Sequence, residues 1–186
     1  MSSSQPFDIY SALLGQRVVF LRGPLDDDAV GRLSAQLLLL ARTEPARSIE
    51  LYIDSSDGSL AAALSLSDVI QSVAASVSTT CIGAAAGPAA LVLASGARGK
   101  RFALPHARIS LKQPPEEIAP GHPTEVEQRA RQVARIRAQA VERLAQRTGQ
   151  PPRRIERDLA QGDWLDVAQA REYGLIDALA ARSANT

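Results

Sequence analysis

The sequence predicts an α/β layered fold with a mainly parallel sheet, in a single domain over residues 1–186. Short runs with a period of two recur in the first half of the chain, and apolar residues at helical spacing stand between them. A parallel crossover needs about the length of a helix, so strands that alternate with helices favour parallel pairing. A chain of 186 residues is long enough for a substantial core and short enough for one domain.

The elements of the first half each carry their own signal. Residues 18–21 are a β-branched and aromatic run that ends before Gly23. Three aspartates at 26–28 supply the cap and first-turn acids of a helix. Apolar and polar residues alternate over 49–53, as in a half-buried strand. The expected order is a strand at 18–21, a helix at 26–40, a strand at 49–53, a helix at 60–70, a strand at 77–81 and a buried helix in the uncharged run 82–97.

The longest predicted helix runs from about Thr124 to Arg147. Thr124 and Glu127 have the spacing of a capping box, and Gly149 suits a left-handed cap at the other end. One stripe of the helix is apolar and consists of Val126, Ala130, Val133, Ile136, Ala140 and Leu144. The arginines of this helix are Arg129, Arg131, Arg135, Arg137, Arg143 and Arg147. They indicate either a solvated charged face or a surface that pairs with acids of a partner.

Composition excludes several classes of function. Apolar residues make up 45% of the chain but aromatic residues only 4%, so Ala, Leu and Val must build the core. A formal net charge of +1 gives no overall field that would attract nucleic acid. The single cysteine, Cys81, fits a reducing compartment, and residues 1–6 lack the pattern of a signal peptide. We expect a cytoplasmic protein that uses no cofactor or metal and binds neither nucleic acid nor membrane.

The stretch from Val77 to Gln113 has the pattern of a hydrolase active site. It predicts a strand, a sharp turn into a helix and a second strand, with small residues around the turn. Many hydrolases use this geometry to lift a nucleophilic serine out of a sheet. Here the turn, residues 83–88, contains neither a hydroxyl nor a thiol. The scaffold of such a site is therefore present without its nucleophile.

Several segments of the chain resemble the proteolytic subunit of the Clp protease, in the same order along the sequence. They are Phe7-Asp8-Ile9-Tyr10-Ser11, Val77-Ser78-Thr79, the segment 96–102, Thr148-Gly149-Gln150, Ile155-Glu156-Arg157-Asp158 and the segment 172–177. The resemblance implies a Clp/crotonase-type layered fold of ββα-like units with a projecting handle helix, here at about 124–147. It also implies seven-membered rings, stacked in pairs around a closed chamber, that cut peptides with a Ser-His-Asp triad in ATP-dependent proteolysis.

The resemblance places each triad position on a residue that lacks the required chemistry. The nucleophilic serine falls on Gly87, which has no side chain to attack a carbonyl. The general base falls on Lys112, which can act as a base only if its pKa is strongly depressed. The third member, counted from Asp158, falls on Gly162, with Asp163 one residue later.

The two backbone donors that would form the family's oxyanion hole are altered as well. One donor position is Gly58, whose neighbour is now Asp57, and a charged carboxylate there disfavours an adjacent oxyanion. The other is Pro88, which has no N–H to donate. Loss of one such donor costs about two to three orders of magnitude in turnover. We therefore expect no serine-protease activity by the family's mechanism.

Other chemistries remain open from the sequence. Ser110 and Lys112 share one face of their predicted strand, which makes a serine–lysine dyad an alternative nucleophile. The other candidate nucleophiles are Ser55, Ser56, Ser59 and Cys81, while the only histidines, His106 and His122, have the surroundings of surface residues. A third alternative is a binding protein of the crotonase type, which would use paired backbone N–H groups.

The leading interpretation is a non-catalytic, Clp-type ring subunit. It would assemble with itself or with active paralogous subunits. The resemblance implies a docking cleft for an ATP-driven unfoldase around Tyr52, but aromatic positions of that cleft are lost, for example at Ser72, and direct docking is in doubt. For the former active site, we expect Lys112 to pair with Asp57 or Asp163, or to turn outward into water.

Overall fold

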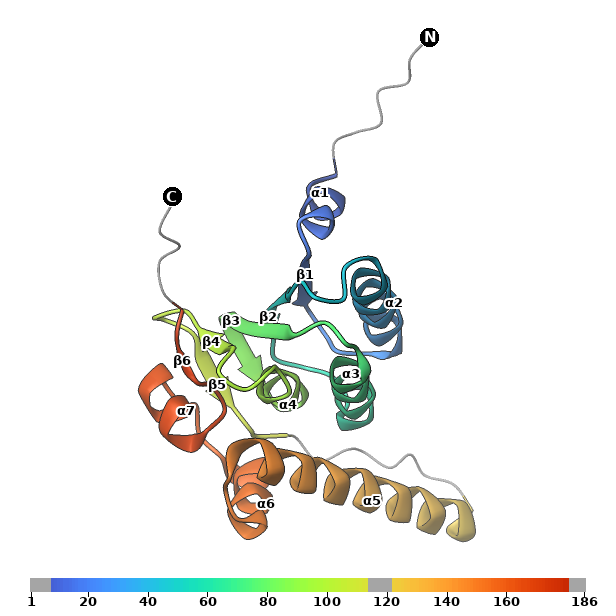
Figure 1. Cartoon of the computed structure of the whole chain (residues 1–186). Coiled ribbons are helices and arrows are strands. Elements are labelled where there is room, and N and C mark those ends of the chain that lie inside the picture. Colours follow the sequence, from blue (N-terminus) through green and yellow to red (C-terminus); the bar gives the residue numbers. More distant parts are fainter. Residues whose placement is uncertain (1–7, 114–121, 181–186) are drawn as a thin grey trace.

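A computed structural model describes residues 8–113 and 122–180 of the chain (Figure 1). The helices are α1 (Ile9–Gly15), α2 (Asp27–Thr43), α3 (Leu60–Ser72), α4 (Pro88–Ala94), α5 (Pro123–Thr148), α6 (Pro152–Gln161) and α7 (Val167–Tyr173). The strands are β1 (Val18–Arg22), β2 (Ile49–Ser55), β3 (Val77–Ala86), β4 (Arg101–Ala103), β5 (Arg108–Ser110) and β6 (Ala178–Leu179). The sequence pattern did not predict α1, α6 or α7.

The strands form one parallel sheet in the order β1-β2-β3-β4-β6, and β5 pairs with the far end of β3. The predicted α/β fold with a parallel sheet is therefore confirmed. Helices α2, α3 and α4 cover one face of the sheet (Figure 1). Ile49, Leu51 and Ile53 of β2 lie on this face and are almost fully buried, whereas Glu50 and Tyr52 alternate onto the opposite face.

The turn from α1 into β1 is fixed by a buried arginine. Arg17 is 2% exposed and adopts φ 70°, an unusual value for a residue other than glycine. Its guanidinium donates hydrogen bonds to the carbonyl oxygens of Leu40, Arg47 and Ser48 around the end of α2. A cation at a helix C-terminus meets unpaired carbonyls and the negative end of the helix dipole. This contact positions β1 against α2.

The small-residue stretch after Cys81 differs from the prediction. Residues 82–86 do not belong to a buried helix, because β3 continues through Ala86 and pairs with β5 over Ala84–Ala86. The helix is α4 alone, and all seven of its residues are buried. Alanine and glycine show no alternation of polarity, so their pattern did not distinguish the end of a strand from the start of a helix.

Helix α5 confirms the long predicted helix but begins differently. It starts at Pro123 after the N-cap His122, and no side-chain hydrogen bond caps it, so the expected Thr124–Glu127 capping box is wrong. Proline at the first helical position makes this start favourable, because its missing N–H would have no partner there. The expected left-handed cap at Gly149 is confirmed, with φ 75°.

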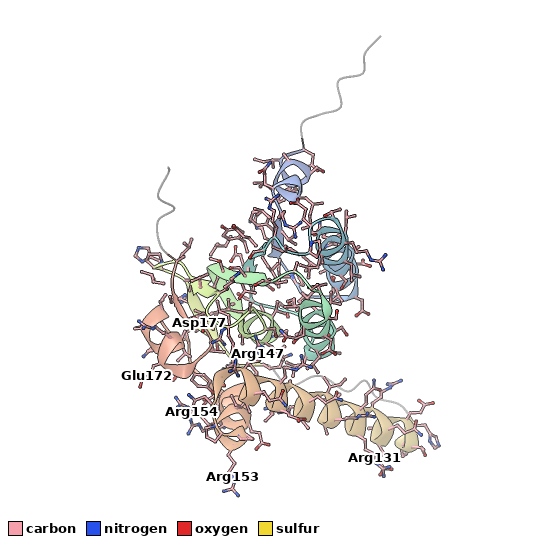
Figure 2. All side chains as sticks on the ribbon, in the orientation of Figure 1. Arg131, Arg147, Arg153, Arg154, Glu172 and Asp177 are labelled. Atoms are coloured by element: carbon pink, nitrogen blue, oxygen red, sulfur yellow. The ribbon has the colours of Figure 1, made fainter. Side chains whose placement is uncertain are left out.

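Only the second half of α5 packs on the body of the protein. Ala140, Val141 and Leu144 are buried, whereas Val126 and Val133 in the first half are half-buried. Figure 2 shows Arg131 near the outlying end of the helix and Arg147 at its inner end. Three of its arginines bind groups outside α5: Arg137 binds the Glu156 carbonyl, and Arg143 and Arg147 bind α3 and the end of α4. These three therefore do not belong to a purely solvated face.

Candidate functional site

The turn from β3 into α4 is made by a single residue, Gly87. Its backbone has φ 52° and ψ −112°, and its N–H donates a 2.8 Å hydrogen bond to the Ser110 carbonyl of β5. Residues with a side chain rarely adopt this backbone conformation, whereas glycine adopts it without a steric penalty. The sharp strand-to-helix turn that the sequence predicted is present, and its apex is a residue without a side chain.

The side chain of Gln113 lies in the space beside Gly87. A Cβ built on Gly87 would be 2.8 Å from Gln113 Oε1 and 3.2 Å from the Lys112 carbonyl oxygen. Gln113 Nε2 donates a long hydrogen bond of 3.5 Å to the Gly58 carbonyl oxygen, and Gln113 Oε1 is buried without a hydrogen-bond partner among the described residues. No motif or periodicity singled out Gln113, apart from its place directly after Lys112.

Gln113 also joins the elbow to the end of α6. Its backbone N–H donates a 2.9 Å hydrogen bond to the carbonyl of Leu159, three residues before Gly162. The structure thus brings Gly58, Gly87, Lys112 and Gly162 to one region, as the resemblance implied. These four positions come from four separate segments of the chain.

Lys112 is not part of a buried ion pair. Its side chain is exposed, and its Nζ forms no ion pair with a carboxylate of the described residues. Pairing with Asp57 or Asp163 is therefore wrong, and the outward orientation is the outcome that the structure has. Asp163 is exposed as well and forms no ion pair with a cation of the described residues.

The loop that carries Gly58 has its donor engaged by its own neighbour. The Asp57 carboxylate accepts a 2.7 Å hydrogen bond from the Gly58 N–H. Gly58 itself has φ 135°, and a Cβ there would collide with the backbone of Leu25. The glycine is thus required by close packing, while its N–H binds a carboxylate. The second donor position, Pro88, is the first residue of α4 and has no N–H.

Gly162 ends α6 in a position that excludes a side chain. Its N–H donates a 2.8 Å hydrogen bond to the Asp158 carbonyl, and a Cβ on Gly162 would collide with that same oxygen. Beside it lies a cavity of about 190 Å³, whose lining includes Leu111, Leu165 and Tyr173. The Tyr173 hydroxyl donates to Asp158 Oδ2 at 2.8 Å, and burial together with this hydrogen bond raises its pKa.

Apart from the exposed Ser56, the other candidate nucleophiles are engaged or inaccessible. Ser110 is 3% exposed, and its Oγ accepts a 3.1 Å hydrogen bond from the backbone N–H of Lys112 rather than from its Nζ. Ser55 donates to the Asp57 carbonyl, and Ser59 caps α3. Burial raises the pKa of the Cys81 thiol to about 12, which leaves almost no thiolate at neutral pH.

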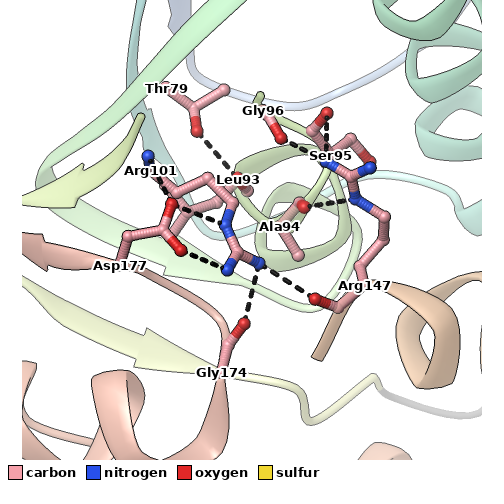
Figure 3. Close-up of polar contacts among 9 residues, drawn as sticks. All are labelled: Thr79, Leu93, Ala94, Ser95, Gly96, Arg101, Arg147, Gly174 and Asp177. Atoms are coloured by element: carbon pink, nitrogen blue, oxygen red, sulfur yellow. Dashed lines mark hydrogen bonds and ion pairs between the residues drawn. The ribbon is translucent and has the colours of Figure 1, made fainter. Parts of the chain in front are cut away.

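A buried cluster of two arginines ties the elbow helix to the base of α5 (Figure 3). The Arg101 guanidinium contacts both oxygens of the Asp177 carboxylate, at 2.6 and 3.0 Å, and donates to the carbonyls of Gly174 and Arg147. Arg147 in turn donates to the last carbonyls of α4, those of residues 94–96. The arrangement satisfies carbonyls that a helix end otherwise leaves unpaired.

The sequence profile of the Clp protease family matches residues 1–183 of this chain. The chain belongs to the Clp protease family. The parallel sheet, the glycine elbow and the long helix α5 are consistent with the Clp/crotonase fold. No described helix is both long and apolar enough to cross a membrane. Within residues 8–113 and 122–180, no group of three or more His, Cys, Asp or Glu side chains is placed to hold a metal ion.

The face of the sheet opposite α2, α3 and α4 carries a groove of about 820 Å³. Tyr52, Phe102, Leu104 and Leu179 contribute its apolar lining, and Glu50 and Lys100 lie among its polar residues. Phe102 supplies a second aromatic ring in this groove, and the sequence alone did not associate Phe102 with this surface. His106 and His122 are both exposed, as expected.

Proposed function

We propose that this member of the Clp protease family is a non-catalytic ring subunit, which contributes to the wall of a protease chamber without cutting peptides. Clp family proteins form oligomeric rings. The observation that carries the proposal is the elbow: Gly87 offers no nucleophile, and Gln113 Oε1 lies only 2.8 Å from the position that a Cβ would take. An acyl-enzyme needs a nucleophile beside a base, and neither is at this elbow.

The remaining parts of the site support the same proposal. The Lys112 side chain is exposed, whereas a lysine that acts as a base in a protein is typically buried. The Gly58 N–H is bound by Asp57, and Pro88 has no N–H, so neither donor position offers an N–H to a developing oxyanion. No specific geometric feature favours the serine–lysine alternative, because Ser110 receives its hydrogen bond from the backbone of Lys112.

The assembly is part of the proposal. The half-buried apolar residues in the first half of α5, such as Val126, Ala130 and Val133, project beyond the body of the subunit. A second ring would bury this stripe, as the handle of the family resemblance implies. The partner is a further copy of the chain or an active paralogous subunit. The groove around Tyr52 is where a Clp ATPase would dock, with reduced aromatic area.

The test combines an activity assay with a mass measurement. The purified chain is expected to leave fluorogenic peptides and casein uncut and to resist fluorophosphonate labelling. The variant Gly87→Ser/Lys112→His is not expected to regain full activity, because Pro88 and Gly162 are unchanged. Turnover that disappears in Ser110→Ala would overturn the non-catalytic assignment. In native mass spectrometry, alone or with an active paralogue, a purely monomeric chain would contradict the ring.

A further inference from the structure

Strand β1 leaves one edge of the sheet open. It is the terminal strand of the sheet and pairs only with β2, in a regular register from Val18 opposite Glu50 to Arg22 opposite Asp54. Exposed strand edges carry unpaired backbone groups, and proteins usually blunt them with bulges, prolines or inward-pointing charges. The register of β1 contains no bulge, and its five residues include no proline.

The register decides which backbone groups face outward. The Arg17 carbonyl accepts a hydrogen bond from the Glu50 N–H, so odd-numbered residues of β1 direct their backbone groups toward β2. The N–H and C=O groups of Val18 and Phe20 therefore point away from the sheet. No described residue forms a hydrogen bond with them. Unsatisfied groups on an edge are a template for one further strand.

The open edge lies in a groove rather than on a flat surface. A cavity of about 360 Å³ is lined by every residue of β1, by the turns of α2 around Arg32 and Gln36, and by Tyr10 of α1. Helix α2 lies on one side of the strand, and α1 on the other (Figure 1). The ring of Phe20 stands between Tyr10, edge-on at 5.7 Å, and Tyr52, stacked at 5.6 Å. Alternate side chains of an added strand would meet these two different walls.

The charges of the groove indicate which kind of peptide would bind in it. Its lining includes Arg22 and Arg32 and no acidic residue. Arg22 binds the Tyr10 hydroxyl, and neither arginine forms an ion pair with a described carboxylate. We infer that the β1 edge is a docking site for an extended peptide segment of a partner protein, which adds a strand to the sheet and places acidic side chains beside Arg22 and Arg32. This inference goes beyond the proposed ring function and does not depend on it.

The inference can be tested with a fluorescein-labelled peptide, Thr-Val-Val-Glu-Glu-Val-Thr, whose two adjacent glutamates point to opposite walls of the groove, in a fluorescence polarisation titration. Binding is expected with a Kd below about 1 mM. A peptide with Lys in place of Glu is expected to bind at least about threefold more weakly, because it loses the two ion pairs. Methylation of alternate backbone nitrogens removes the ladder donors, and one of the two methylation registers is expected to abolish binding.

Variants of the protein separate backbone from side-chain contributions. Phe20→Pro removes the outward N–H, and Phe20→Ala removes the same ring but keeps that N–H; the proline variant is expected to bind about two- to tenfold more weakly than the alanine variant. Arg22→Ala/Arg32→Ala is expected to weaken binding about three- to tenfold, whereas Arg135→Ala on the exposed face of α5 leaves it unchanged.

Three results would overturn the inference. The first is no binding at millimolar peptide with the wild-type chain, and the second is equal binding by both N-methylated peptides. The third is self-association that excludes the peptide and is lost in Phe20→Pro but not in Phe20→Ala, which would assign the edge to a second copy of the chain. Because all readouts are binding measurements on the intact protein, their failure leaves the activity and ring-mass tests of the proposed function unaffected.

Discussion

Removal of the Asp177 charge is expected to destabilise the protein through Arg101. The Arg101 side chain is only 8% exposed, and among the described residues the Asp177 carboxylate is its one anionic partner, at 2.6 Å. Asp177→Asn preserves the shape of the side chain but leaves the buried guanidinium without a counter-charge. Removing one partner of a buried ion pair typically costs about 3–5 kcal/mol. The Asp177 side chain is 23% exposed, and two carbonyls still bind Arg101, so we expect about 2–3 kcal/mol.

The assay is thermal unfolding followed by far-UV circular dichroism and by the fluorescence of Trp164, the only tryptophan. For a chain of this length the loss corresponds to a Tm lowered by about 4–12 °C. Protein concentration must be held constant, because assembly adds to apparent stability. Asp68→Asn is the matched control, since the Asp68–Arg143 pair is as short, at 2.6 Å, but the Asp68 side chain is 64% exposed. It is expected to cost less than about 1 kcal/mol.

Two outcomes would refute this reasoning. If Asp177→Asn melts within about 1 °C of the wild type, or no lower than Asp68→Asn, the burial of Arg101 does not make its counter-charge important. The double variant Arg101→Met/Asp177→Leu gives an independent check, because it removes both charges. It is expected to be more stable than Asp177→Asn, since no unpaired ion remains in the interior.

Three further predictions concern acid stability, a thiol and a glycine. Burial opposes the ionisation of Asp177, but the hydrogen bonds and charge of Arg101 outweigh this effect and hold the pKa of Asp177 below its ordinary value. The stability that the ionised Asp177 contributes is present above its unfolded-state pKa of about 4 and is lost as the pH falls through its folded-state pKa. Below about pH 4 the wild type is therefore expected to lose more Tm than Asp177→Asn. Cys81, with its pKa raised to about 12 by burial, is expected to resist Ellman's reagent at pH 8 in the folded protein and to react fully in urea; fast labelling of the native chain would contradict its burial. Gly162→Ala is expected to cost about 1–3 kcal/mol in urea unfolding because its Cβ collides with the Asp158 carbonyl, whereas Gly31→Ala, with open space around it, is expected to be neutral or stabilising.

The alternation of strands and helices could be predicted because polarity alternates wherever one face is buried. Ile49, Leu51 and Ile53 show this plainly, and all three are in the core. The end of β3 could not be predicted in the same way, since its last residues are small and uniformly apolar. The start of α5 was misplaced for a different reason: Pro123 allows the helix to begin before Thr124, and the spacing of Thr124 and Glu127 carried no information about that choice.

The candidate site could be located from the sequence, but the positions of the side chains around it could not be predicted. Gly87, Lys112 and Gly162 were identified through family resemblance, and contacts of Gln113 link their segments. The orientation of the Lys112 side chain depends on how neighbouring residues pack around it, and no sequence motif indicates that packing. The position of Gln113 Oε1 beside Gly87 depends on contacts among β5, the loop of Gly58 and α6. Such contacts between distant segments leave no periodic trace in the chain.

The arginine cluster also bears on the order in which the molecule can fold. Arg101 reaches Asp177 across 76 residues of sequence, and Arg147 reaches Ser95 across 52. Contacts of such long separation require the closure of large loops and tend to slow folding. While the chain is being synthesised, β1, β2 and β3 can pair before the base of α5 has its final partners. In a nascent chain that stops before Asp177, the elbow helix α4 would therefore pack against a sheet in which Arg101 still lacks its counter-ion.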